Sequence, residues 1–157
     1  MKIYFAAPLF SEAEASFNSN WAESLRSELG VEVYLPQEQD DINDKSQYAN
    51  SIDIAKYDTD ELLTCDLVVA VLDGLVIDPG VAAEVGVAWH AGIPVIGVCT
   101  DQRQCNGYDN NKKLEALSQL CENQFSYVNL YVVGLIKQRG TVVSSKQQMV
   151  EEVKKYV

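Results

Sequence analysis

Short apolar runs alternate with helix-like segments along most of the chain, and this alternation constrains the fold more than any other feature. Residues 67–72 are apolar throughout, which is typical of a strand buried on both faces of a parallel sheet. Strands that alternate with helices at this spacing predict an α/β fold built on a parallel sheet. The strand-like runs are residues 3–7, 31–35, 67–72, 95–98 and 128–133.

The intervening segments carry helix signals. Ser11 and Glu14 match a capping box, apolar residues recur every fourth position from Phe17 to Leu29, and Gly30 ends the segment. Further helices are expected over residues 51–64, 80–91 and 112–121, and from Ser144 or Ser145 to about Tyr156. Together these elements predict one domain over residues 1–157, a flavodoxin-like doubly wound sheet of five parallel strands with helices on both faces.

Charge and cysteine content exclude several functions. The chain has 12 Lys and Arg against 23 Asp and Glu, and a net charge of −11 disfavours binding to DNA or RNA. The four cysteines form no CxxC pair and there is one histidine, so no metal or cofactor site is expected. The absence of a signal-peptide pattern and of a long apolar run predicts a cytoplasmic protein without a membrane partner.

Glu84 is the acidic residue that the pattern singles out. In the predicted helix it shares a face with Val81 and Ala88, and a carboxylate on an apolar face costs free energy unless it is paired or used. Its place near the helix start favours the anionic form through the helix dipole, as a nucleophile requires. The competing interpretation is an ordinary glutamate on a solvated helix surface.

Two aspartates are expected close to Glu84. Asp78 precedes Pro79, so it is either the N-cap of the same helix or an acid that faces a leaving group. Asp58 lies four residues before Leu62, which points it partly inward, although a surface aspartate would fit the position too. Three converging carboxylates suit a reaction through an oxocarbenium-like transition state, in which one attacks the anomeric carbon and another donates to the leaving group.

Other candidate residues lie at the predicted strand ends, where ligands bind in such folds. Tyr4, within the first strand, is either a core aromatic or the residue whose hydroxyl orients Glu84. Ala7 ends the first predicted strand, Phe10 follows it, and Gly80 opens the helix that carries Glu84. We expect these three residues to contact the substrate.

These residues resemble the nucleoside 2-deoxyribosyltransferase family. The resemblance covers most of the chain in order, and its most specific part is the Asp-x-Gly-x-x-x-Glu-x-Gly run of residues 78–86. Residues 101–121 match no recognisable part of the family pattern, and Tyr131 stands where the best-known members keep a methionine. The other matching segments are residues 3–10, Asp58 with Leu62, and residues 65–70, 92–95 and 128–130.

The resemblance implies a role for each matched residue. Glu84 would form a covalent 2-deoxyribosyl intermediate, and Asp58 and Asp78 would contact the nucleobase and move its proton. Tyr4 would position the nucleophile. Asn129 would reach the sugar 5'-hydroxyl from a neighbouring subunit, which implies a homo-oligomer. The substrates would be a 2'-deoxynucleoside and a free nucleobase, with hydrolysis when water is the acceptor.

Two alternatives remain open at this stage. One is an N-glycosidase of 2'-deoxynucleoside 5'-monophosphates, although the loop of residues 6–10 offers no cation and loses an amide at Pro8. The other is a nucleoside- or nucleotide-binding module without turnover, since a fold alone does not give a function. Clustered carboxylates disfavour this second alternative, because a pure binder gains little from like charges.

Overall fold

Five parallel strands form one sheet in the order β2-β1-β3-β4-β5. The computed structural model describes residues 1–39, 50–104, 111–116, 118–121 and 128–157. The predicted flavodoxin-like α/β fold is confirmed. The strands are β1 (Lys2–Ala6), β2 (Glu32–Tyr34), β3 (Leu67–Val71), β4 (Val95–Val98) and β5 (Thr141–Val143).

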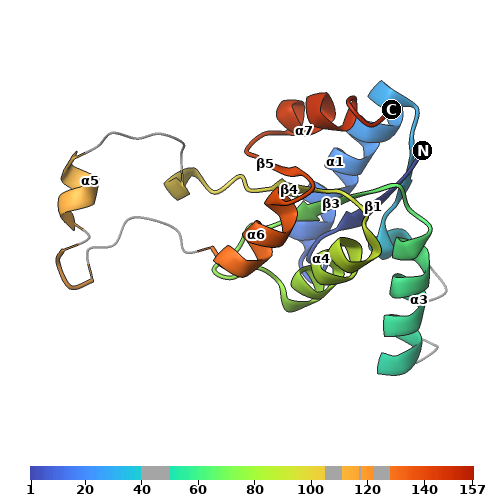
Figure 1. The fold of residues 1–157 in the computed structure, drawn as a ribbon, viewed down its shortest axis with the longest axis horizontal. Coiled ribbons are helices and arrows are strands. Elements are labelled where there is room, and N and C mark those ends of the chain that lie inside the picture. The colour runs from blue at the N-terminus through green and yellow to red at the C-terminus, as the bar shows by residue number, and fades with distance from the viewer. Residues whose placement is uncertain (40–49, 105–110, 117, 122–127) are drawn as a thin grey trace.

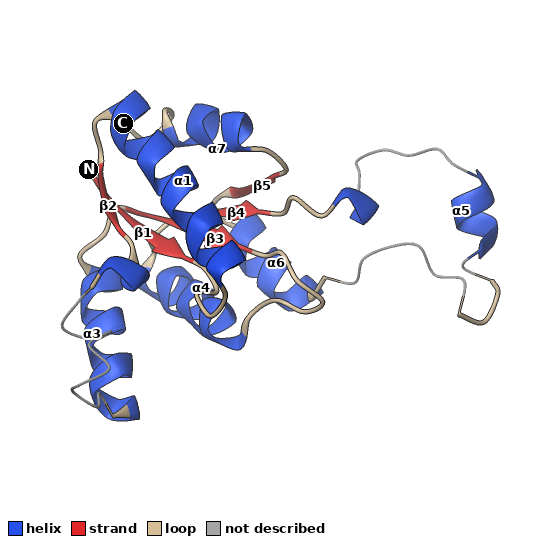
Figure 2. Ribbon diagram, turned by 180° about the vertical axis from the view of Figure 1, so that it is seen from behind, coloured by secondary structure: helices blue, strands red, loops and turns tan. Residues whose placement is uncertain are grey.

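Helices cover both faces of the sheet (Figure 1). One face carries α1 (Glu12–Leu29) and α7 (Lys146–Val153), and the other carries α3 (Ser51–Leu63), α4 (Pro79–Ala91) and α6 (Leu130–Lys137). Figure 2, from behind, shows the same two layers with the strands between them. The remaining described elements are α5 (Asn111–Ala116) and two 3-10 turns, Pro36–Glu38 and Gln102–Gln104.

The two faces of the sheet enclose separate apolar cores. Along β1, Ile3 and Phe5 join the core under α1 and α7, whereas Tyr4 and Ala6 join the core under α3, α4 and α6. This division follows from the two-residue period of a strand, which sends successive side chains to opposite faces. Tyr4 is therefore directed toward the helix that carries Glu84.

The first helix follows its sequence signals. The Ser11 side chain accepts a hydrogen bond from the Glu14 amide, the Glu14 carboxylate accepts one from the Ser11 amide, and Gly30 ends the helix with a φ of 64°. Trp21 and Leu25 are buried on its inner face. The predicted capping box and apolar face are confirmed.

The predicted fifth strand over residues 128–133 is wrong. Leu130 begins α6, and the side-chain oxygen of Asn129 accepts hydrogen bonds from the amides of Tyr131 and Val132, which fixes the helix start. The run of β-branched residues suggested a strand, but the buried positions are spaced at three and four residues, as a helix requires. The buried residues of α6 are Val132, Leu135 and Ile136. The fifth strand is instead Thr141–Val143.

Other boundaries moved by a few residues. The helix predicted over residues 112–121 spans only Asn111–Ala116, and the last helix, capped by Ser145, ends at Val153 rather than near Tyr156. Residues 36–50, for which the sequence predicts neither helix nor strand, lie mostly outside the described residues. In the described part of the chain, no helix has both the length and the apolar character that a bilayer crossing requires.

Candidate active site

A hydrogen bond joins β1 to α4 at the centre of the predicted site. The Tyr4 hydroxyl donates to Glu84 Oε1 over 2.6 Å. Tyr4 is fully buried in β1, between β2 and β3, so its ring is a rigid support for the carboxylate. Within the described residues, Glu84 Oε2 accepts no hydrogen bond, which leaves one carboxylate oxygen available for chemistry.

The start of α4 sets the position of Glu84. Asp78 is the N-cap, and its Oδ1 accepts hydrogen bonds from the amides of Gly80 (2.9 Å) and Val81 (3.1 Å). The capping interpretation of Asp78 is therefore confirmed, while its role as an acid stays a prediction. Both amides bond to Oδ1, so Oδ2 makes no hydrogen bond with the described part of the chain.

The buried face of α4 carries Glu84 toward the sheet. Val81, Val85 and Ala88 pack into the core under α4, and Glu84 lies among them at helical spacing, as the sequence predicted. A Cβ on Gly80 would approach Asp78 Oδ1 to 3.0 Å, so the glycine leaves room for the cap.

The pKa of Glu84 is raised to about 7, chiefly by burial and to a smaller extent by the negative charges of Asp58 and Asp78, against the hydrogen bond from Tyr4, which lowers it. This differs from the expectation that the helix dipole would favour the anion. Glu84 is the sixth residue of α4, beyond the first turn in which the dipole acts strongly. Loss of hydration is the larger effect.

Asp58 lies on α3, across from Glu84. Asp58 shares one face of α3 with Ile54 and Leu62, each four residues away. Exposure falls along this face, from 40% at Ile54 to 1% at Leu62. Asp58 is half-buried between them, and this burial raises the pKa of its carboxyl. Its negative charge also raises the pKa of Tyr4, so the two groups lie close enough to interact.

The predicted substrate-contact residues are more dispersed. Ala7 packs partly buried just beyond β1, but Phe10 is 81% exposed. Asn129 is exposed at the start of α6, and its Oδ1 makes both capping bonds. In the part of the chain that the structure describes, no hydrogen bond connects Phe10 or Asn129 to Asp58, Asp78 or Glu84. The structure brings together the side chains of Tyr4, Asp58, Asp78 and Glu84, and the Gly80 amide is bonded to Asp78.

The decisive comparison is with models of protein families. The nucleoside 2-deoxyribosyltransferase family model matches residues 3–152 of the chain. The chain belongs to this family. The match runs through all five strands and includes every carboxylate of the candidate site. No curated protein matches the chain with significant sequence similarity.

Solved structures resemble this family member over nearly its whole length. A conserved protein from Enterococcus faecalis V583 is 52% identical, with a TM-score of 0.94 over 100% of this chain and 99% of that one. The 2-deoxyribosyltransferase of Bacillus psychrosaccharolyticus is 19% identical, with a TM-score of 0.66 over 96% of this chain and 90% of that one. The 2-deoxyribosyltransferase of Leishmania mexicana is 20% identical, with a TM-score of 0.63 over 96% of this chain and 97% of that one. These last two similarities concern the fold.

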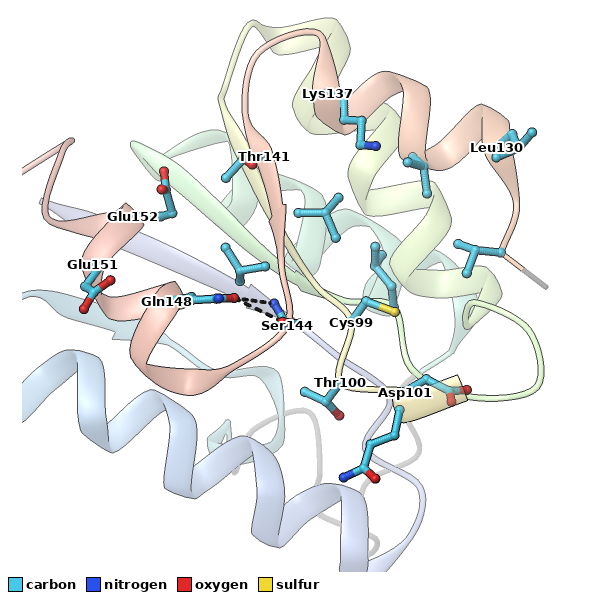
Figure 3. Close-up of a pocket in the computed structure, with 16 residues that line it drawn as sticks. Cys99, Thr100, Asp101, Leu130, Lys137, Thr141, Ser144, Gln148, Glu151 and Glu152 are labelled. Atoms are coloured by element: carbon cyan, nitrogen blue, oxygen red, sulfur yellow. Dashed lines mark hydrogen bonds between the residues drawn. The ribbon is translucent and has the colours of Figure 1, made fainter. Parts of the chain in front are cut away.

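A separate cavity of about 1260 Å³ lies at the β5 edge of the sheet, between α6, β5 and α7 (Figure 3). Its lining includes Thr100, Lys137, Ser144 and Gln148, and none of the four site residues. The Gln148 side chain is bonded to the Ser144 amide over 2.9 Å. We place the candidate site at Glu84 rather than in this cavity, because burial and two neighbouring aspartates raise the pKa of the Glu84 carboxyl, as is common at catalytic sites.

Sequence reasoning missed Tyr34 of β2. Its ring stacks on that of Tyr4 at a centroid distance of 5.3 Å, and its side chain is 7% exposed. Its hydroxyl is buried without a hydrogen-bond partner in the described structure. The available signal was weak: a tyrosine at the end of a short strand is usually a core aromatic.

Proposed function

We propose that this family member transfers 2-deoxyribose between nucleobases through a covalent intermediate on Glu84. The observation that supports it best is the 2.6 Å hydrogen bond from Tyr4 to a mostly buried Glu84. A carboxylate held by one oxygen, with the other oxygen open and two aspartates nearby, has the arrangement that retaining N-glycosyl transfer needs.

In the first step, Glu84 Oε2 attacks C1' of the deoxyribose while the C1'–N bond breaks. The nucleobase leaves with the bonding electron pair and takes a proton from Asp58 or Asp78. The ionised Glu84 stabilises the positive charge that develops on the sugar ring, and it does so strongly because the site is largely shielded from water. Tyr4 holds Oε1 throughout.

In the second step, a ring nitrogen of the incoming nucleobase attacks C1', and the ester bond to Glu84 breaks. The carboxylate recovers its electron pair, and the aspartate that lost its proton regains one from the incoming base. Water in place of the base gives free 2-deoxyribose, so exchange and hydrolysis share the intermediate. The choice between them depends on how well the bound base excludes water.

The first loop favours a substrate without a 5'-phosphate. Two amides of this loop, those of Phe10 and Ser11, already donate to Glu14 Oε2, at 3.0 and 2.7 Å, so neither is free to hold a phosphate. The negative charge of Glu14 also repels an anion. A free 2'-deoxynucleoside therefore suits this loop better than a monophosphate.

We further propose that Asn129 completes the pocket of a neighbouring subunit. Its Oδ1 caps α6, while its amide nitrogen makes no hydrogen bond with the described residues and remains available as a donor. Beside it, Leu130 and Tyr131 are 80% and 75% exposed, an apolar surface that a homo-oligomer interface would cover.

The proposal is tested by incubating the protein with 2'-deoxyinosine and adenine. We expect hypoxanthine and 2'-deoxyadenosine to form, and chromatography of the reaction mixture measures both. Formation of hypoxanthine without 2'-deoxyadenosine would identify a hydrolase. If no purine or pyrimidine 2'-deoxynucleoside gives either a free base or an exchanged nucleoside, the protein is a binding module without turnover. 2'-Deoxyinosine 5'-monophosphate, run in parallel, should be cleaved more slowly, and faster cleavage would favour the monophosphate N-glycosidase.

The covalent step has its own test. Mass spectrometry of protein mixed with a 2'-deoxynucleoside should show an added 2-deoxyribosyl group, mapped by peptide analysis to Glu84. The adduct should be absent from Glu84→Ala and present in Glu28→Ala, a matched change at an exposed glutamate of α1. Turnover without any adduct would point to direct displacement by the acceptor.

A further inference from the structure

Two tyrosines lie side by side at the base of the site, and only one has a hydrogen-bond acceptor among the described residues. Tyr4 of β1 is in register with Tyr34 of β2, and their rings stack with an interplanar angle of 23°. The Tyr4 hydroxyl donates to Glu84, whereas the Tyr34 hydroxyl is buried and has no partner among the described residues. Buried polar groups in native structures almost always have a partner, so an orphaned hydroxyl here requires an explanation.

Asp58 is the acceptor that fits. Its half-buried carboxylate accepts no hydrogen bond from the described part of the chain, and the ring of its neighbour Tyr57 lies 6.4 Å from the Tyr34 ring. The other acidic group near Tyr34, Glu61, already accepts from Lys2 Nζ over 2.7 Å. A hydroxyl donor and a carboxylate acceptor, neither with a hydrogen bond to the described residues, thus lie in the same part of the structure.

Electrostatics agree with this geometry. Burial raises the pKa of the Tyr34 hydroxyl, and Asp58 is the next largest cause, ahead of Tyr57, Glu61 and Cys65. A negative charge has this effect on a hydroxyl only when it lies nearby. The negative carboxylate also attracts the hydroxyl hydrogen, so a rotation of the Asp58 side chain that brings the two groups into contact would form a charge-assisted bond.

We propose that Tyr34 is a positioning residue whose hydroxyl donates a hydrogen bond to the Asp58 carboxylate in the substrate-bound enzyme, as Tyr4 does to Glu84. This inference rests on the proposed function, in which Asp58 contacts the nucleobase. Each working carboxylate then has its own tyrosine, one on β1 and one on β2. The stacked rings fix the two donors relative to each other, and with them the nucleophile relative to the group that faces the base.

The test is Tyr34→Phe, assayed with 2'-deoxyinosine and adenine, with Tyr57→Phe as the matched control. We expect kcat to fall about tenfold or more in Tyr34→Phe, the loss of one hydrogen bond to a charged group, with a smaller change in KM. The limb of the kcat pH profile that depends on Asp58 should move to higher pH, because the bond favours the ionised carboxylate. The urea midpoint should be unchanged or higher, since the removed hydroxyl has no partner in the free protein.

A double-mutant cycle with Asp58→Asn separates this role from a packing role. If Tyr34 acts through Asp58, adding Tyr34→Phe to Asp58→Asn should cost little further activity, whereas independent effects would multiply. If the wild type is active, two results would overturn the positioning role alone. One is a Tyr34→Phe variant as active as the wild type, and the other is a double mutant in which the activity losses of Tyr34→Phe and Asp58→Asn multiply. A wild type that neither transfers nor cleaves would overturn the proposed function itself.

Discussion

Replacement of Glu84 by glutamine should make the protein more stable at alkaline pH while abolishing turnover. The folded protein holds Glu84 with a pKa of about 7, against an ordinary value of 4.5. A group whose pKa is raised on folding contributes its stability below the unfolded value and loses it as the pH rises through the folded value. The ionised Glu84 therefore destabilises the fold at pH 8.

The size of the effect follows from the same two values. Their difference is about 2.5 pKa units, and one unit corresponds to about 1.4 kcal/mol, so the cost is about 3 kcal/mol above pH 7. Because Glu84 is not completely buried, solvent screening makes this an upper value. Glutamine mimics the protonated acid and can still accept from Tyr4, so Glu84→Gln should escape the cost.

Urea unfolding between pH 4 and pH 8.5 measures this difference, with the fluorescence of Trp21 and Trp89 as the signal. The wild type and Glu84→Gln should have similar unfolding free energies near pH 4 and diverge between about pH 4.5 and pH 7, with the variant more stable by up to about 3 kcal/mol. Glu28→Gln, on the exposed surface of α1, should follow the wild type at every pH.

A constant offset between wild type and Glu84→Gln across this range would refute the reasoning. It would mean that Glu84 titrates alike in the folded and unfolded states and that burial does not control its ionisation. A variant less stable than wild type at pH 8 would mean that the charge of Glu84 stabilises the fold.

Three further predictions concern the neighbours of Glu84. Tyr4→Phe removes a hydrogen bond that lowers the pKa of Glu84, so the acid limb of kcat/KM, expected near pH 7 in the wild type, should move to higher pH; an unmoved limb would argue against Glu84 as its source. Asp78→Ala should lose about 1 kcal/mol of unfolding free energy through the missing N-cap, whereas Asp78→Ser, which can still cap the helix, should keep most of it. If Asp78 also acts as an acid, both variants should lose turnover. An active Asp78→Ser would show that Asp78 only caps the helix. An equal mixture of Glu84→Ala and Asn129→Ala, unfolded and reassembled together, should regain about a quarter of wild-type activity in a dimer that shares sites across its interface, and no recovery would place Asn129 outside its neighbour's pocket.

Local sequence signals were sufficient for most of the architecture. The capping box of Ser11 and Glu14, the cap at Asp78 and the apolar run of β3 act over a few residues, so the sequence alone identified them. The same signals failed for α6, where β-branched residues favoured a strand. The helical spacing of its buried residues becomes decisive only when the helix packs beside α4.

The chemistry of the site depended on contacts that the sequence does not display. The motif around Glu84 pointed to the nucleophile because small and apolar neighbours surround it locally. Its pKa of about 7 comes from the removal of water by elements far apart in the chain, and its hydrogen bond joins residues 80 positions apart. Tyr34 became a candidate only when the register of β1 and β2 placed it on Tyr4 and beside Asp58. The sequence by itself determined which side chains were available, and tertiary packing decided which of them lose water and face one another, because desolvation and long-range contacts are properties of the folded surroundings rather than of neighbouring residues.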